Sequence, residues 1–303
     1  MVEPDSGRAA EAADSYSIPV FRSLDELLAA NLRLDAAIVA VPTGHHCSVG
    51  AQLLAAGIDV LVEKPLAANL AEADELIALA EEHNRILQVG HLERFNPAVL
   101  AIEPRLRRPM FFEAHRLSVF TPRSLDVDVV LDLMIHDLDI VLAFARSPVR
   151  EVRAVGLPVV SSRVDIANVR VEFESGCVAN FTASRVSTER VRKLRFFEPR
   201  RYVSIDYARR DLLMIEIDPK AAAGAGPAPG LSFAKPEITP GEPLRLELDS
   251  FLDCVRARRE PRVTARQGRE ALSLALEIQA QMAAHANRAG LQSFFAPVIS
   301  PSS

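Results

Sequence analysis

The 303-residue sequence lacks the marks of several protein classes. Its longest apolar runs fall far short of the roughly 20 residues that a membrane-spanning helix needs. Its first residues have neither the basic nor the apolar segment of a secretory signal. A formal net charge of −5 argues against a protein that binds nucleic acid through its overall charge. We therefore expect neither a membrane nor a nucleic acid among its partners.

Cysteine is scarce, because only Cys47, Cys177 and Cys254 occur and they lie far apart. An odd number of distant cysteines does not favour a disulfide framework, so we expect a cytoplasmic protein. No pair of cysteine or histidine residues has the spacing of a zinc site, and we expect no metal.

Lysine is also scarce compared with arginine, the other basic residue. Of 35 basic residues only four are lysine, and arginine supplies the rest. Lysine can lose its proton when its surroundings lower its pKa, whereas arginine in practice cannot. We interpret Lys193, Lys220 and Lys235 as surface charges, but Lys64 directly follows an apolar run.

The first third of the chain alternates short apolar runs with helical patterns. This alternation predicts right-handed βαβ units in a doubly wound parallel sheet. The run at 36–41 is typical of a strand buried on both faces. The expected strands cover 36–41, 58–62 and 86–89, and the expected helices cover 23–31, 45–56 and 69–83.

The pattern changes after residue 97. A long helix is expected at 126–145, a Pro-, Gly- and Ala-rich loop at 218–242, and helices at 244–258 and 267–287. Runs of strands after helices predict an α+β domain with a large, mostly antiparallel sheet that is open on one face. We therefore predict two domains, 1–96 and 97–303. The expected strands cover 151–157, 166–173, 178–187, 190–197 and 202–206.

The residues that follow the predicted parallel strands are the first candidates for a site. Ligands of open parallel sheets bind beyond the carboxyl ends of the strands. Those ends are followed by 42–46, by Glu63-Lys64-Pro65 and by Gly90-His91. The ammonium of Lys64 could bind an oxyanion or a substrate hydroxyl there, and a structural ion pair with Glu63 is an equal alternative.

The expected helix at 126–145 carries a second candidate group. Asp128, Asp132 and His136 are spaced i, i+4 and i+8, which predicts one shared helix face. A carboxylate one turn before a histidine can orient the imidazole as a general base. The alternative is an acidic helix start next to a packed histidine.

A basic run forms the last candidate. Residues 185–201 include seven basic and two acidic side chains. They could form a phosphate-binding or interface patch, or a solvated strand face.

Four motifs together resemble the Gfo/Idh/MocA oxidoreductase family, in its order and at its spacings. The resemblance implies that 1–96 form a Rossmann domain that binds a nicotinamide cofactor. It also implies that 97–303 shape the substrate site and an oligomer interface, in a homodimer or homotetramer. The motifs are Pro42-Thr43-x-x-His46, Glu63-Lys64-Pro65-Leu66-Ala67, Arg94-Phe95-Asn96-Pro97 and Asp132-x-x-x-His136.

The resemblance implies catalytic roles for three residues. Lys64 is similar to the active-site lysine of the family, which binds the reacting hydroxyl and contacts the nicotinamide end of the cofactor. Asp132 and His136 are similar to its Asp-x-x-x-His pair, with His136 as the acid/base.

Five further residues are implied to contact the cofactor. Pro42, Thr43, His46 and Glu63 match the strand ends beside it. Glu3 matches an acidic residue of the family whose carboxylate accepts hydrogen bonds from the adenosine ribose, which favours NAD over NADP.

A narrower resemblance is to the nucleotide-sugar branch of the family, carried by 90–97, 132–137 and 180–185. It implies oxidation at C3 of UDP-N-acetylglucosamine in lipid A biosynthesis, with His91, Arg94 and Arg185 as further substrate contacts beside Lys64, Asp132 and His136. Two alternatives stay open. One is a related dehydrogenase for another sugar, an inositol or a small carbonyl compound, and the other is a non-catalytic protein that binds sugar nucleotides.

The sequence departs from the family at its start. The family opens with a strand, a Gly-x-Gly-x-x-Gly turn and a helix, and this sequence contains no such turn. We expect an N-terminally truncated first domain, with weak NAD binding if the chain really starts at Met1.

Overall fold

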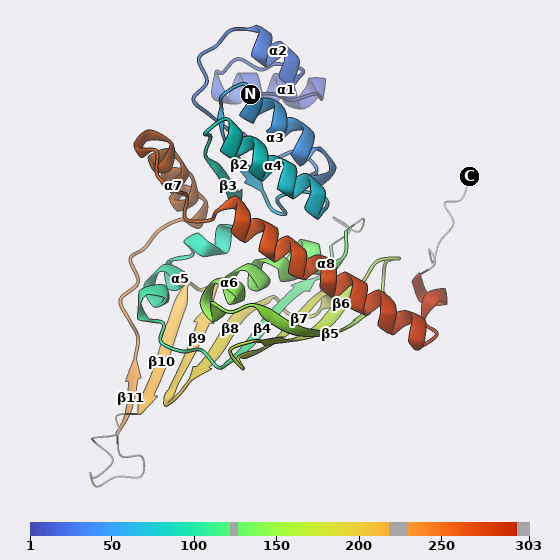
Figure 1. Ribbon diagram of the computed structural model, residues 1–303, viewed down its shortest axis with the longest axis vertical. Coiled ribbons are helices and arrows are strands. Elements are labelled where there is room, and N and C mark those ends of the chain that lie inside the picture. Colours follow the sequence, from blue (N-terminus) through green and yellow to red (C-terminus); the bar gives the residue numbers. More distant parts are fainter. Residues whose placement is uncertain (122–126, 218–229, 296–303) are drawn as a thin grey trace.

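The computed structural model describes residues 1–121, 127–217 and 230–295, and it contains two separate sheets. The smaller one, called the parallel sheet below, has the order β1-β2-β3, with β1 at Ala36–Val39, β2 at Asp59–Glu63 and β3 at Leu87–Gly90. Helices α3 (His46–Ala55) and α4 (Leu70–Glu82) pack on one face, and α7 (Pro243–Ala257) packs on the other (Figure 1).

Local signals explain the helices around the parallel sheet, and these predictions are confirmed. The side chain of Ser23 caps α2 (Leu24–Ala29), and Asn69 caps α4 by accepting a hydrogen bond from the N–H of Glu72. Gly57 follows α3 with a φ of 78°, a conformation that costs glycine little. An additional helix, α1 (Ser6–Tyr16), had not been predicted.

The expected burial of the first predicted strand is wrong. The side chain of Ile38 is 52% exposed and that of Val41 is 37% exposed. The reason is that β1 is an edge strand, paired only with β2 in the described residues. By contrast, β2 lies between two strands, and Val60, Leu61 and Val62 are almost fully buried.

The second sheet, called the large sheet below, has eight strands in the order β11-β10-β9-β8-β4-β7-β6-β5. All neighbouring pairs are antiparallel except β4 and β7. The predicted α+β architecture with a mostly antiparallel sheet is therefore confirmed. The strands are β4 Phe111–Val119, β5 Val149–Leu157, β6 Ile166–Phe173, β7 Val178–Ser187, β8 Val191–Glu198, β9 Arg201–Asp206, β10 Asp211–Ile217 and β11 Leu231–Ala234.

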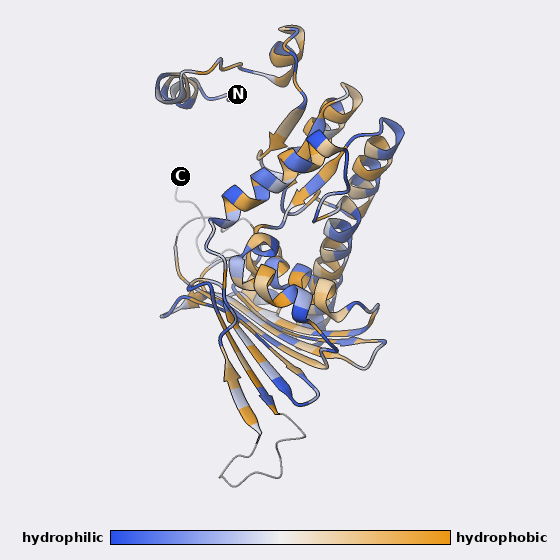
Figure 2. Cartoon of the chain, turned by 90° about the vertical axis from the view of Figure 1, so that its left-hand side faces the viewer, coloured by the Kyte–Doolittle hydropathy of each residue, from blue (hydrophilic) through white to orange (hydrophobic). Residues whose placement is uncertain are grey.

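Helices cover one face of the large sheet and leave the other face open (Figure 2). The covering helices are α5 (Pro97–Ile102), α6 (Ile135–Ala145) and α8 (Ala265–Arg288). The core beneath them includes Phe112, Phe181, Phe196 and Ile278, each at most 1% exposed.

Three predictions for the second half of the chain need correction. Strands β4 and β10 had not been predicted, and β11 lies inside the segment 218–242 that was expected to be a loop; 218–229 lie outside the described residues. The helix expected from residue 126 begins later, because Val130–Met134 form a π-helical turn, η4, before α6. Residue 126 itself lies outside the described residues.

Helix α8 connects the two sheets. It begins with a capping box between Thr264 and Gln267, passes β3 and then runs along the large sheet (Figure 1). A Cβ at Gly268 would lie 2.5 Å from Cγ2 of Val89, so glycine allows this close approach to β3. Helices α7 and α8 belong to the predicted second domain but pack against elements of the predicted first domain. The boundary between 1–96 and 97–303 therefore stays a prediction.

Among the described residues, no helix combines the length and the apolar composition that crossing a bilayer requires.

Candidate active site

Lys64 connects the end of β2 to the turn that precedes α6. Its Nζ donates hydrogen bonds to the backbone oxygen of Asp132 at 2.7 Å and to that of Leu131 at 3.4 Å. It also lies 3.9 Å from Oδ1 of Asp132. The ion-pair partner of Lys64 is therefore Asp132, on the element that leads to His136, and not its chain neighbour Glu63.

The π-helical turn explains why a backbone oxygen is available to Lys64. The N–H of Ile135 donates to the oxygen of Val130, five residues back, instead of to that of Leu131 as in an α-helix. The oxygen of Leu131 thereby loses its α-helical partner, and the ammonium group of Lys64 approaches it. Such π-helical turns are frequent at functional sites.

The expected common face of Asp128, Asp132 and His136 is wrong. Asp128 lies before the helix, where its carboxylate accepts hydrogen bonds from the N–H groups of Val130 at 2.8 Å and Leu131 at 3.2 Å. Asp132 turns to Lys64, and no hydrogen bond joins it to His136 in the described part of the chain. No contact in the described residues therefore supports the predicted role of Asp132 in orienting the imidazole of His136.

His136 is half-buried, and its Nδ1 is buried without a hydrogen-bond partner among the described residues. Burial, and then the positive charges of Lys64 and Arg116, lower the pKa of His136 well below its ordinary value of 6.5. The imidazole is thus neutral at pH 7 and can accept a proton. Burial also lowers the pKa of Lys64, although Asp132 and Glu63 oppose that decrease.

A buried charge cluster behind His136 was missed by the sequence analysis. Arg116 on β4 donates to both carboxylate oxygens of Asp137, at 2.7 and 3.0 Å, and to Glu93 at 3.1 Å. Asp137 directly follows His136 in α6. Asp137, the acidic residue next to His136, was visible in the sequence as a sign of such a cluster. Its partner Arg116 was missed because it lies on β4, a strand that had not been predicted.

The predicted cofactor residues divide into two groups. Pro42 is exposed, and Thr43, Glu63 and Lys64 are half-buried at the ends of β1 and β2, so a ligand can reach them. His46 is only 1% exposed, which leaves it almost no surface for a cofactor.

The ring of His46 joins the two strand ends. Its nitrogens lie 2.8 Å from the oxygen of Pro65 and 2.9 Å from the oxygen of Val41. Both nitrogens are therefore engaged by the backbone. Glu3, in turn, accepts hydrogen bonds from the N–H of Asp5 and, at 3.0 Å, from the guanidinium of Arg8. Its contacts thus lie within the first turn of α1 and the residues before it.

Two of the predicted substrate residues are buried in ion pairs. Arg94 is 3% exposed and lies 3.8 Å from Asp139, and Arg185 is 5% exposed and lies 3.7 Å from Asp165. His91 is 1% exposed. The structure does not bring these three side chains to a surface where a substrate could contact them.

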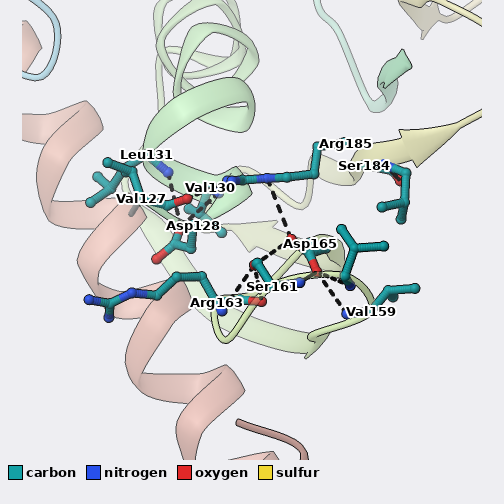
Figure 3. A network of polar contacts seen from close by, with 12 residues as sticks. Val127, Asp128, Val130, Leu131, Val159, Ser161, Arg163, Asp165, Ser184 and Arg185 are labelled. Carbon is teal, nitrogen blue, oxygen red and sulfur yellow. Dashed lines mark hydrogen bonds and ion pairs between the residues drawn. The ribbon is translucent and has the colours of Figure 1, made fainter. Parts of the chain in front are cut away.

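Arg185 instead belongs to a network that fixes the start of η4 (Figure 3). It donates to the backbone oxygen of Val127, next to Asp128. Burial alone would raise the pKa of Asp165, but hydrogen bonds from the N–H groups of Val159 and Val160 outweigh it and lower this pKa.

The rest of the basic run 185–201 does not form one patch. Arg195 on β8 pairs with Glu113 at 2.9 Å, and Arg201 is buried against Glu198 at 2.8 Å. Because these charges are paired, they do not support a phosphate site; half-exposed Arg195 fits the alternative of a solvated strand face, and buried Arg201 does not.

The side chains that a nicotinamide could contact stand at the accessible ends of β1 and β2. The side chain of Glu63 lies over Gly90, where a Cβ would come within 3.0 Å of Oε2 of Glu63. The absence of a side chain at Gly90 thus leaves room for the carboxylate at the strand ends, beside Lys64. In the described residues, no group of three or more His, Cys, Asp or Glu side chains is placed to hold a metal ion.

Two family models match the chain. A model described as an oxidoreductase family with an NAD-binding Rossmann fold matches residues 1–91, and a GFO/IDH/MocA C-terminal domain matches residues 99–198.

Curated relatives point in the same direction. The chain is 35% identical over 292 residues to the UDP-N-acetylglucosamine 3-dehydrogenase of Acidithiobacillus ferrooxidans, which covers 95% of this chain and 90% of the relative. It is 33% identical over 159 residues to the inositol 2-dehydrogenase of Leifsonia xyli, which covers 50% of this chain and 47% of that relative.

Solved structures agree with these matches. The structure of the Acidithiobacillus ferrooxidans enzyme superposes with a TM-score of 0.86 at 34% identity, over 97% of this chain and 90% of that one. A levoglucosan dehydrogenase in complex with NADH and levoglucosan has a TM-score of 0.80 at 17% identity, over 93% and 87% of the two chains, which shows a shared fold.

Proposed function

Because the chain belongs to the Gfo/Idh/MocA family of oxidoreductases, we propose that it oxidises the C3 hydroxyl of UDP-N-acetylglucosamine with NAD as the hydride acceptor. One observation supports this proposal most. The ammonium of Lys64, from the parallel sheet, is bonded to the backbone of Asp132, four residues before the neutral imidazole of His136 above the large sheet. In this proposal the cation and the base act on the same substrate at the junction of the two sheets.

These two groups suit the oxidation of an alcohol. Neutral His136 accepts the proton of the sugar hydroxyl, and the ammonium of Lys64 stabilises the negative charge that develops on its oxygen. Asp132 and the two backbone oxygens hold Lys64 at the junction.

Bound NAD would supply the carbon that accepts the hydride. Pro42, Thr43, Glu63 and Lys64 would hold the nicotinamide end, since these side chains stand at the accessible ends of β1 and β2. The carboxylate of Glu3, which also accepts a hydrogen bond from Arg8, would bind the ribose hydroxyls and in this way favour NAD over NADP.

A substrate and cofactor panel tests the proposal. UDP-N-acetylglucosamine, the same sugar without UDP, and myo-inositol are each incubated with NAD or NADP, and reduced nicotinamide is measured. We expect turnover with the nucleotide sugar and NAD, and transfer of deuterium from a C3-labelled substrate to the nicotinamide. Label that stays on the sugar would contradict the position of oxidation.

The other outcomes of the panel identify the alternatives. Faster turnover of myo-inositol would identify a relative of the inositol dehydrogenases. Binding of the nucleotide sugar without reduced nicotinamide under any condition would identify a non-catalytic binding protein.

The proposal includes a homodimer or homotetramer formed through the open face of the large sheet. One cross-strand row on that face is apolar over five strands and ends at Phe233, which is 68% exposed. The other members of the row are half-buried, and a contiguous apolar surface that solvent reaches favours association. The row consists of Phe233, Ile215, Tyr202, Phe197 and Phe111, which face one another in register.

Light scattering tests this assembly. The unmodified protein is expected to be a dimer or tetramer, and Ile215→Lys, next to Phe233 in the row, is expected to give monomers. Leu244→Lys on α7, at a leucine that is 48% exposed outside the row, is the matched control. A monomeric unmodified protein would contradict the assembly.

The cytoplasm and lipid A biosynthesis complete the proposal. The cysteines of the described chain are free and buried, as in proteins of a reducing compartment. An oxidised C3 on an amino sugar nucleotide can accept a second amino group, and we propose that the resulting diamino sugar enters lipid A biosynthesis.

A further inference from the structure

Arg116 is the central residue of a buried charge cluster between the two sheets. Its side chain projects from β4 under α6 and is 3% exposed. The Nε and Nη2 atoms donate to the two oxygens of Asp137, and Nη1 donates to Oε1 of Glu93. A fork with two parallel bonds fixes orientation as well as distance.

The cluster is closed by two further residues. The second carboxylate oxygen of Glu93 accepts a hydrogen bond at 3.1 Å from the side-chain amide of Asn96, which also donates to the backbone oxygen of Tyr207 at 3.0 Å. The ring of Tyr207 faces the guanidinium, 5.3 Å from ring centre to Cζ. The cluster thereby joins β4, the first turn of α6, the segment after β3 and the end of β9.

We propose that Arg116 is a positioning residue for His136: by holding Asp137 and Glu93 it fixes the first turn of α6, and with it the imidazole, relative to Lys64. Asp137 directly follows His136 in the chain, so a rotation of that turn would move both side chains together. Glu93 lies after β3 of the parallel sheet, so the same guanidinium fixes the distance between the two sheets. This proposal rests on the proposed function for its catalytic meaning.

The electrostatic surroundings of His136 support this role. Lys64 at the end of β2, Arg116 on β4 and Arg192 on β8 face it with positive charge, and His91 after β3 adds to the same effect. Asp132 on η4, paired with Lys64, and Asp137 and Asp139 on α6 supply the negative charges nearby. The guanidinium of Arg116 therefore contributes to keeping the imidazole neutral.

A matched pair of substitutions tests the positioning role. Arg116→Lys keeps the charge but loses the fork, and Arg201→Lys does the same at a buried pair away from His136. Arg201 is 2% exposed in its side chain and pairs with Glu198 at 2.8 Å. Both variants should lose similar thermal stability. Only Arg116→Lys should lower kcat, on the order of 10²-fold with KM nearly unchanged, as expected for a displacement of about 1 Å.

A second pair tests the electrostatic effect without relying on turnover. The protonation of His136 is followed by NMR of labelled histidine, with His136→Asn for assignment. Glu93→Gln removes a negative charge and should move the titration of His136 to lower pH. Arg116→Gln removes the positive charge and should move it to higher pH. The acidic limb of kcat/KM should move with the titration.

The two arms separate the possible failures. Equal losses of activity in Arg116→Lys and Arg201→Lys, or a titration of His136 that does not move in Glu93→Gln, would overturn the positioning role. If Arg116→Lys does not fold, Glu93→Gln, which is close to isosteric, decides alone. An unmodified protein without turnover on any substrate would overturn the proposed function, while the NMR comparison would still test Arg116.

Discussion

Buried carboxyl groups on the two sides of the site are neutralised in different ways. Beside the large sheet, the guanidinium of Arg116 lies between two carboxylates and binds both. Beside the parallel sheet, Glu247 on α7 is 1% exposed and faces Glu63, and one of its oxygens has no hydrogen-bond partner in the described chain. Burial, and then the charge of Glu63, raise the pKa of Glu247 to about 8.

The difference shows what can neutralise a buried carboxylate. Where an arginine is present, Asp137 and Glu93 can hold defined positions as hydrogen-bond acceptors. Where no cation is close, a proton takes its place, and the group titrates near neutral pH. The side of the site that carries the base is thus built around a permanent cation, and the side that carries Lys64 includes a carboxyl group that depends on pH.

The largest expected effect comes from replacing the two reactive side chains, one from each side. His136→Ala removes the base and should lower kcat by about 10²–10⁴-fold. Lys64→Arg keeps the charge, but its wider head group does not fit the two backbone oxygens of η4, and the loss should be comparable. Steady-state kinetics and thermal unfolding should show inactive, folded proteins in both cases.

Substitutions of the same type outside the site are the controls. Lys193→Arg changes a half-exposed lysine on β8, and His83→Ala changes a histidine at the end of α4. Both should keep their activity. A nearly normal rate for Lys64→Arg or His136→Ala would remove that residue from the catalytic machinery.

The parallel sheet could be predicted from the sequence because its signals are local. Asn69 begins one helix and Gly57 ends another, each through contacts a few residues away. Lys64 could be predicted because it directly follows a buried strand. The free edge of β1 could not be predicted in this way, since it depends on which strands are its neighbours.

Strand β4 shows why the large sheet was harder to predict. Its inward side chains are Phe112, Ala114 and Arg116, while Phe111 and Leu117 point outward. A buried arginine and outward apolar residues erase the alternation that identifies a strand. The charge of Arg116 is tolerated only because Asp137 and Glu93, distant in sequence, neutralise it.

The site residues also divide into those that local signals identify and those that depend on distant contacts. Motif resemblance located Lys64, Asp132 and His136; Lys64 and Asp132 contact each other in the structure, and the charge of Lys64 acts on His136. The same motifs also contain His46 and Arg94, whose side chains bind the backbone or a buried carboxylate instead of facing the site. A motif shows that a side chain is needed at a position, but the direction of that side chain depends on contacts that the motif does not contain.

A smaller effect tests the other side of the comparison. The folded protein keeps a proton on Glu247 up to a pKa of about 8, whereas an ordinary glutamate releases it near 4.5. Between these values the folded state binds more protons than the unfolded state, so Glu247 lowers stability as pH rises. Glu247→Gln, which is neutral at every pH, should therefore stabilise the protein by up to about 3 kcal/mol at pH 7 and hardly at all near pH 4.5.

Thermal unfolding of both proteins at about pH 5 and about pH 8 measures this difference, which should grow with pH. Glu82→Gln, at an exposed glutamate at the end of α4, should show the same small difference at both values. If the stabilisation by Glu247→Gln is equal at both pH values, Glu247 is charged in the folded protein. A cation or water network would then have to neutralise it, and the contrast between the two sides of the site would disappear.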